Sequence, residues 1–182
     1  MISNSNKKLN DLVPGSIVGT SSFRREFQLK RIRKDLNFKL IRGNVDTRIK
    51  KLNDGEYDCI ILAKAGCKRL KLNLNYLELE HLTSISQGSI CLRFNKETEE
   101  IHKLLGPLND GVMKRKINEC NHFLNLINAD CNSAVAVDYR DDVLQAEVYG
   151  KKEFIKFSAL NAEDAFKRFK DLDGLRLLNE HN

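Results

Sequence analysis

Three short apolar runs within the first 70 residues alternate with segments of helical spacing, and this alternation limits the fold most strongly. We predict strands at 16–19, 37–41 and 58–63, and helices at 23–34, 45–52 and 65–70. Turns at Gly43 and Gly55 separate several of these segments. Because strands joined through a helix normally run parallel, the order predicts a parallel sheet with helices on its faces.

The rest of the chain follows a different pattern. We predict a strand at 87–94, a helix at 97–105, one long amphipathic helix whose apolar stripe runs from Met113 to Ile127, strands at 134–139, 144–149 and 153–157, and a last helix from Asn161. The expected fold class is α/β. A polar tail at 1–13 precedes a parallel βαβ sheet domain at 14–83, and a small α+β C-terminal domain occupies 108–182.

Charge is distributed unevenly along the chain. Residues 1–80 hold 17 basic and 9 acidic side chains, a net charge of +8, whereas residues 81–182 hold 14 and 16, a net charge of −2, so the positive charge of the chain lies in its first part. A positive half of this kind favours an anionic ligand such as nucleic acid, phosphate or a polycarboxylate. A solvated basic surface explains the charge alone equally well.

Three hydroxyl side chains and two arginines follow the first predicted strand: Thr20, Ser21, Ser22, Arg24 and Arg25. The carboxyl ends of parallel strands are where ligands bind, because the next helix presents free N–H groups there. The hydroxyls could simply cap the helix. The arginines favour a ligand, since a cation in the first turn opposes the helix dipole and a bound anion would remove that conflict.

The second strand-to-helix junction repeats this chemistry. Arg42, Asn44 and Arg48 lie around Gly43, which allows close approach of the backbone. Because both junctions open on the same edge of the sheet, four arginines there predict a polyanion site. The glycine-rich fingerprints of phosphate loops and dinucleotide folds do not occur in the sequence.

The spacing of the cysteines and the lengths of the apolar runs indicate in which cellular compartment the protein resides. The five cysteines, at positions 59, 67, 91, 120 and 131, form no C-x-x-C pair, which indicates reduced thiols and no metal site. The longest apolar runs have the length of strands, and the first ten residues are too polar for a secretory signal. We therefore expect a cytoplasmic protein with no membrane partner.

Several segments resemble one enzyme family. VGTSSFRR at 18–25, LIRGNVDTRIKKL at 40–52 and DGEYDCIILAKAGCKRL at 54–70 are similar to the middle domain of porphobilinogen deaminase, also called hydroxymethylbilane synthase. The similarity is dense over 14–72. It continues through Ser86-Gln87-Gly88 and into a C-terminal domain in which 128–133 occupies the place of the family's cysteine loop.

The resemblance implies a function in heme (tetrapyrrole) biosynthesis. The family joins four porphobilinogen units head to tail into hydroxymethylbilane and releases ammonia. The growing chain is held on a dipyrromethane cofactor through a thioether to a cysteine, which by position is Cys131. The resemblance implies cofactor contacts at Thr20, Ser21, Ser22, Arg24, Arg25, Arg48 and Gln87, and substrate contacts at Arg42, Asn44 and Arg69.

Departures from the family bear on activity. Asp130 next to Cys131 would raise the pKa of the thiol and repel anionic pyrroles, so cofactor loading stays open. The family's N-terminal portion, with its proton-handling aspartate, has no counterpart, and no catalytic residue is identified in this chain. We expect 84–107 to be a crossover segment of that otherwise missing first domain, completed by a separate N-terminal deaminase chain. Alone, this chain should bind ligand without turnover.

Two other interpretations stay open. The βαβ organisation is also like that of type II periplasmic-binding domains, so the chain could be a non-catalytic binder of polycarboxylates or a degenerate remnant of the enzyme. Nucleic-acid binding is suggested only by the isoelectric point of about 9.1. It is disfavoured because aromatic residues are not interleaved with the basic ones, and we expect no nucleic-acid partner.

Overall fold

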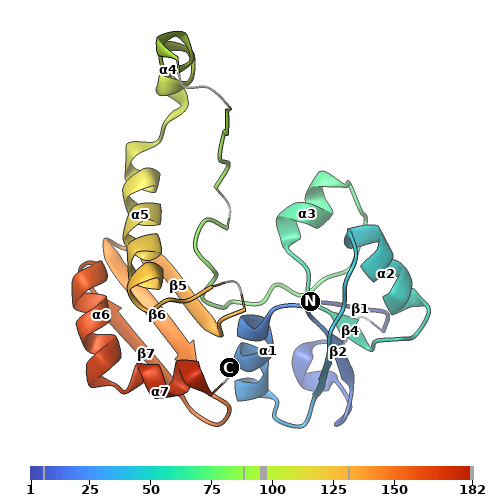
Figure 1. The fold of residues 1–182 in the computed structure, drawn as a ribbon. Helices are drawn as coiled ribbons and strands as arrows, with labels where there is room; N and C mark the ends of the chain where they lie inside the picture. Colours follow the sequence, from blue (N-terminus) through green and yellow to red (C-terminus); the bar gives the residue numbers. More distant parts are fainter. Residues whose placement is uncertain (6, 88, 95–97, 131, 181–182) are drawn as a thin grey trace. The chain divides into compact units, whose positions relative to one another are not determined.

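The chain forms two compact units in the computed structural model, which describes residues 1–182 except 6, 88, 95–97, 131, 181 and 182 (Figure 1). The first unit comprises Met1–His81 with Asn132–Ala134. The second comprises Leu82–Cys131 with Val135–Asn182. One unit has a parallel-rich sheet and the other a separate antiparallel sheet, which confirms the predicted mixture of α and β structure.

The sheet of the first unit has the strand order β1-β4-β2-β3. Its central strand β2 (Ile17–Gly19) pairs in parallel with β3 (Asn37–Lys39) and β4 (Cys59–Ile60). Each of these strands is followed by a helix: α1 (Phe23–Ile32), α2 (Val45–Asn53) and α3 (Lys64–Arg69). The predicted alternation is therefore confirmed, with shorter strands than the apolar runs indicated.

The polar tail predicted at 1–13 is wrong. The strand β1 (Ile2–Ser3) pairs antiparallel with β4, and a short 3-10 helix η1 (Leu9–Asp11) follows it. The physical reason is burial: Met1, Ile2, Leu9 and Leu12 are all buried in the first unit. Four spaced apolar side chains hold the segment on the sheet although most of its residues are polar.

Two apolar clusters cover the two faces of this sheet. Leu29 of α1 belongs to one cluster together with Val18 and Cys59. Leu52 of α2 and Cys67 of α3 belong to the other. Helices thus cover both faces, as expected for a sheet built from strand-helix-strand units, and the carboxyl ends of β2, β3 and β4 stay open at one edge.

The strand predicted at 87–94 is not formed among the described residues of that segment. Its apolar side chains are exposed instead, with Ile90 86% and Leu92 53% accessible. An extended segment becomes a strand only when a neighbouring strand satisfies its backbone, and the described chain supplies none here. The predicted helix that follows does form, as α4 (Glu99–Leu105), and leads into η2 (Gly106–Leu108).

The second unit packs two helices on a three-stranded antiparallel sheet. The helix α5 (Gly111–Leu126) precedes the strands β5 (Val135–Arg140), β6 (Val143–Tyr149) and β7 (Phe154–Ala159), and α6 (Ala162–Asp171) follows them. Phe123 of α5 contacts Phe157 of β7 and Phe169 of α6 edge to face at the centre of the core. These elements confirm the predicted secondary structure of the C-terminal region.

A last helix, α7 (Gly174–Asn179), was not predicted. It begins after Asp173, whose positive φ of 56° reverses the chain at the end of α6, and it buries Leu177 and Leu178. A six-residue segment carries too little periodicity to reveal a helix from sequence. Among the described residues, no helix is both long enough and apolar enough to span a bilayer.

Candidate anion-binding site

The junction between β2 and α1 is built on close packing behind Gly19. A Cβ at this position would lie 2.9 Å from Cδ1 of Tyr57, so only glycine fits. The hydroxyls of Thr20 and Ser22 organise the turn, accepting hydrogen bonds from the N–H groups of Ser22 at 3.2 Å and Arg25 at 3.4 Å. The Ser22 hydroxyl therefore caps α1, as the simpler interpretation of the sequence has it, while the Thr20 hydroxyl fixes the turn before the helix.

The junction between β3 and α2 is fixed by its own side chains. Gly43 has a φ of 116°, a conformation that favours glycine. Asn44 caps α2, because its Oδ1 accepts hydrogen bonds from the Thr47 N–H at 3.0 Å and the Thr47 hydroxyl at 2.6 Å. The Nε of Arg48 donates to the Gly43 carbonyl at 2.8 Å, which holds this guanidinium over the loop.

Arg48 joins the two junctions. Its Nη1 lies 3.4 Å from the hydroxyl oxygen of Ser21, which is exposed and belongs to the first junction. Arg25 reaches the end of the third strand, where its Nη1 donates to the Ile61 carbonyl at 3.4 Å. Side chains from the carboxyl ends of β2 and β3 and a backbone oxygen following β4 therefore meet at one edge of the sheet, as the parallel order predicts.

The electrostatics of Arg25 favour an anion. Burial lowers the pKa of Arg25, and the positive charge of Arg48 lowers it further. None of the salt bridges found among the described residues involves Arg25 or Arg48. Two neighbouring cations of this kind repel each other, and a carboxylate or phosphate between them would stabilise both through charge-assisted hydrogen bonds.

Three other predicted arginines take different places. Arg24 is only 6% exposed, and its Nη1 donates to Oε1 of Gln28 at 3.3 Å, one turn further along α1. Arg42 is exposed beside Gly43, and Arg69 is exposed in the last turn of α3. No hydrogen bond between described residues ties Arg42 or Arg69 to Arg25 or Arg48, so their roles stay predictions.

Two further predicted residues are not part of the described site of the first unit. Gln87 is exposed and belongs to the second unit. Cys131 lies outside the described residues, so its attachment role stays a prediction. Sequence reasoning missed the Ile61 carbonyl as an anchor for Arg25; the end of the third strand, at the same edge, is the signal that could have indicated it.

The fold and site define a mixed α/β protein with arginines gathered where parallel strands end. Comparison with known proteins is consistent with this class. Residues 1–103 match the family described as porphobilinogen deaminase, dipyromethane cofactor binding domain. Since this match covers more than half of the 182 residues, the chain belongs to the porphobilinogen deaminase family.

Individual relatives agree with the family match. The chain is 44% identical to the porphobilinogen deaminase of Streptococcus sanguinis over 135 residues, 70% of this chain and 44% of that protein. It is 37% identical to the Geobacillus kaustophilus deaminase over 141 residues, 75% and 46% of the two chains, and 36% identical to that of Thiobacillus denitrificans over 157 residues, 83% and 51%. The chain thus spans about half the length of the curated relatives that it matches.

Proposed function

We propose that this chain acts in tetrapyrrole biosynthesis as the carboxylate-binding part of a hydroxymethylbilane synthase. The complete enzyme would condense four porphobilinogen units head to tail into hydroxymethylbilane with release of ammonia. The observation that carries the proposal is the pair Arg25 and Arg48, held together at the open sheet edge beside the exposed Ser21 hydroxyl. Pyrroles that carry acetate and propionate groups supply the anions that such a pair requires.

The residues of this site fit a dipyrromethane cofactor. Its carboxylates would be held by Arg25 and Arg48, with Ser21 as a hydroxyl donor, and the cofactor would supply the covalent anchor on which the pyrrole chain grows. We propose Cys131 as its attachment thiol. Burial raises the pKa of Cys59 and of Cys120 to about 12, so neither of these buried thiols would be a nucleophile near neutral pH.

The proton-handling group of the reaction is proposed to come from another polypeptide. Two acids in the matching region already have structural partners: Glu26 pairs with Lys30 at 2.6 Å, and Asp58 accepts the N–H of Ile17 at 2.7 Å. Exposed apolar side chains at Ile90, Leu92 and Leu104 favour a partner that covers 84–107. We infer that a separate N-terminal deaminase chain completes a first domain around this segment.

Two finer assignments accompany this proposal. The first unit, with helices on both faces of a parallel-rich sheet and arginines at the strand ends, is proposed to be like a type II periplasmic-binding domain. A cytoplasmic location is proposed because Cys59, Cys67, Cys91 and Cys120 are free thiols, as a reducing compartment would keep them.

Reconstitution tests the proposed function. The chain would be produced alone and together with the part of the Streptococcus sanguinis deaminase that it does not cover. We expect no consumption of porphobilinogen by either piece alone and measurable consumption with ammonia release by the mixture, because the proton-handling group and the arginine site would then be united. Turnover by this chain alone would contradict the proposed division of roles.

A matched variant shows whether reconstituted activity depends on the site. Arg48→Gln should lower the activity of the mixture strongly, whereas Lys50→Gln, an exposed cation two residues further along α2, should leave it nearly unchanged. Equal activities of the two variants would show that turnover does not depend on the arginine site and would contradict the proposed role of Arg48.

A further inference from the structure

One tyrosine is buried in an otherwise exposed turn of the first unit. Tyr57 lies in the turn between α2 and β4 and is 4% exposed, whereas Glu56 and Asp58 on either side of it are exposed. The Glu56 N–H donates to the Lys51 carbonyl at 3.1 Å. The Asp58 N–H donates to the Ile17 carbonyl at 2.9 Å. The backbone on both sides of Tyr57 is therefore fixed, and so is the base of its side chain.

The ring of Tyr57 packs against the first junction. A Cβ at Gly19, the last residue of β2, would lie 2.9 Å from Cδ1 and 3.2 Å from Cε1 of this ring, so the ring lies directly on the glycine backbone. The Nζ of Lys39, the last residue of β3, lies 5.1 Å from the ring centroid, a distance at which a cation is attracted to an aromatic ring. The ring therefore contacts the residues that end β2 and β3.

The hydroxyl of Tyr57 supports the second junction. It donates a hydrogen bond to the Leu40 carbonyl at 2.9 Å, and a tyrosine hydroxyl keeps its proton near neutral pH. The register of β2 with β3 ends at Gly19 and Lys39, and the Thr20 N–H donates to the Lys39 carbonyl at 3.2 Å. The Tyr57 hydroxyl therefore holds the chain one residue beyond the point where the paired strands end.

A short path leads from this hydrogen bond to the arginine site. The chain runs from Leu40 through the fully buried Ile41 to Gly43. Ile41 and Tyr57 belong to the same apolar cluster, so this stretch is packed as well as hydrogen bonded. The Gly43 carbonyl then accepts the Nε of Arg48 at 2.8 Å. The position of the Arg48 guanidinium thus depends on where Leu40 and Gly43 are held.

We propose that Tyr57 is a positioning residue of the carboxylate site, which fixes Arg48 relative to Arg25 by supporting the second junction on the first. The inference rests on the proposed function, because it assigns how that same site keeps its shape. Since Tyr57 is buried, it acts through Leu40 and Gly43 rather than by touching a ligand. A ligand with several carboxylates gains from guanidinium groups whose separation is fixed before it binds.

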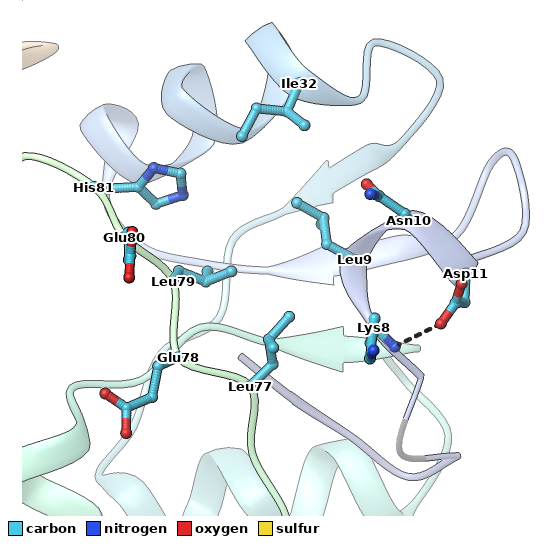
Figure 2. A pocket seen from close by; sticks show the side chains of 10 residues that line it. All are labelled: Lys8, Leu9, Asn10, Asp11, Ile32, Leu77, Glu78, Leu79, Glu80 and His81. Atoms are coloured by element: carbon cyan, nitrogen blue, oxygen red, sulfur yellow. Dashed lines mark hydrogen bonds between the residues drawn. The ribbon is translucent and has the colours of Figure 1, made fainter.

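A groove elsewhere on the first unit offers a second location for an anionic ligand (Figure 2). Its volume is about 430 Å³, and its lining includes Lys8, Leu79 and His81 but no residue of either junction. A ligand held there through Lys8 would not depend on Tyr57. Variants of Lys8 and Tyr57 therefore distinguish the two locations.

The first test needs no ligand. Tyr57→Phe keeps the ring and removes only the hydroxyl, and its effect is measured as the exchange with water of the Arg48 Nε–H, followed by nuclear magnetic resonance. We expect this exchange to become faster by about threefold or more, because the Gly43 carbonyl that protects the Nε–H is less firmly held. Tyr139→Phe is the matched control. Its hydroxyl donates to the Leu160 carbonyl at 3.1 Å in the second unit, and its loss should leave the Arg48 signal unchanged.

The second test measures binding of a synthetic dipyrromethane tetracarboxylate by isothermal titration. Tyr57→Phe should bind about threefold to tenfold more weakly than the parent, whereas Tyr139→Phe and Lys8→Gln should bind as the parent does. Because Tyr57 acts through Arg48, Tyr57→Phe should cause no further loss in an Arg48→Gln background. In an Arg25→Gln background it should weaken binding as much as in the parent.

The outcomes separate this role from the proposed function. Equal exchange of the Arg48 Nε–H in Tyr57→Phe and the parent would overturn the proposal, and so would a further loss of binding in the Arg48→Gln background. Equal acceleration of the backbone amides of β2 and β4 would also overturn it, because the hydroxyl would then be merely structural. Absence of binding by the parent, or weaker binding by Lys8→Gln alone, would contradict the proposed function, while the exchange of the Arg48 Nε–H would still decide the role of Tyr57.

Discussion

The double variant Arg25→Gln/Arg48→Gln should lose nearly all affinity for a pyrrole polycarboxylate. Each guanidinium would donate charge-assisted hydrogen bonds worth about 1.5–3 kcal/mol to the bound carboxylates. Each single variant is therefore expected to bind about tenfold to a hundredfold more weakly, and the double variant about a hundredfold to ten-thousandfold more weakly. Isothermal titration with a synthetic dipyrromethane tetracarboxylate measures this, and its methyl ester should not bind.

The stability of these variants separates binding from structure. Because burial and, after it, the positive charge of Arg48 both lower the pKa of Arg25, its charged form is destabilised, and Arg25→Gln should leave the melting temperature unchanged or raise it slightly. The double variant Lys34→Gln/Lys50→Gln removes the same charge from exposed positions and should bind nearly as the parent does. A large fall in melting temperature for Arg25→Gln, or equal binding by both double variants, would contradict an anion site.

Phe169→Ala should destabilise the second unit by about 3–5 kcal/mol, the usual cost of deleting a fully buried phenylalanine. Phe169 has no exposed surface and contacts Phe123 edge to face at a ring-centroid distance of 6.2 Å. Since no other described element fills its place between α5 and α7, the cavity would not close. Hydrogen exchange should therefore speed up by about two to four orders of magnitude in β5, β6 and β7.

The matched control removes an exposed side chain next to the same helix. Leu160 is 70% exposed, and the hydrogen bonds that it makes with Tyr139 and Asp164 use its backbone, so Leu160→Ala should change exchange little. Exchange in β2, β3 and β4 should be unaffected by Phe169→Ala, because these strands belong to the other unit. Equal acceleration in both units would show that they unfold as one.

Local sequence patterns predicted an element well where the element makes its own backbone hydrogen bonds, as a helix does, or where its partner strand lies nearby in sequence. The alternation of apolar runs and capped helices predicted β2 through α3, and the spacing of Met113, Cys120 and Ile127 predicted α5. The strand expected at 87–94 failed because a strand depends on a neighbour that the described chain does not contain. The prediction of a polar tail at 1–13 failed because a few buried apolar side chains hold the segment on the sheet although most of its residues are polar.

The candidate site, too, was predictable from the sequence only in part. Position in the sequence placed Ser21, Arg25 and Arg48 near strand ends, and parallel pairing brought these ends together. The sequence could not indicate that Arg24 is buried along α1, or that a backbone carbonyl following β4 anchors Arg25. Such contacts depend on how neighbouring elements pack, which residue periodicity does not specify.

The intact mass of the full chain, purified from cells that make tetrapyrroles, tests the central claim most directly. The account predicts a species heavier by two pyrrole units, lost entirely in Cys131→Ala and kept in Cys91→Ala, which removes an exposed free thiol elsewhere. Asp130→Asn should increase the modified fraction, because removing the neighbouring charge favours the thiolate and the approach of anionic pyrroles. An unmodified mass, even when the missing part of the enzyme is supplied, or a modification that persists in Cys131→Ala, would contradict the account.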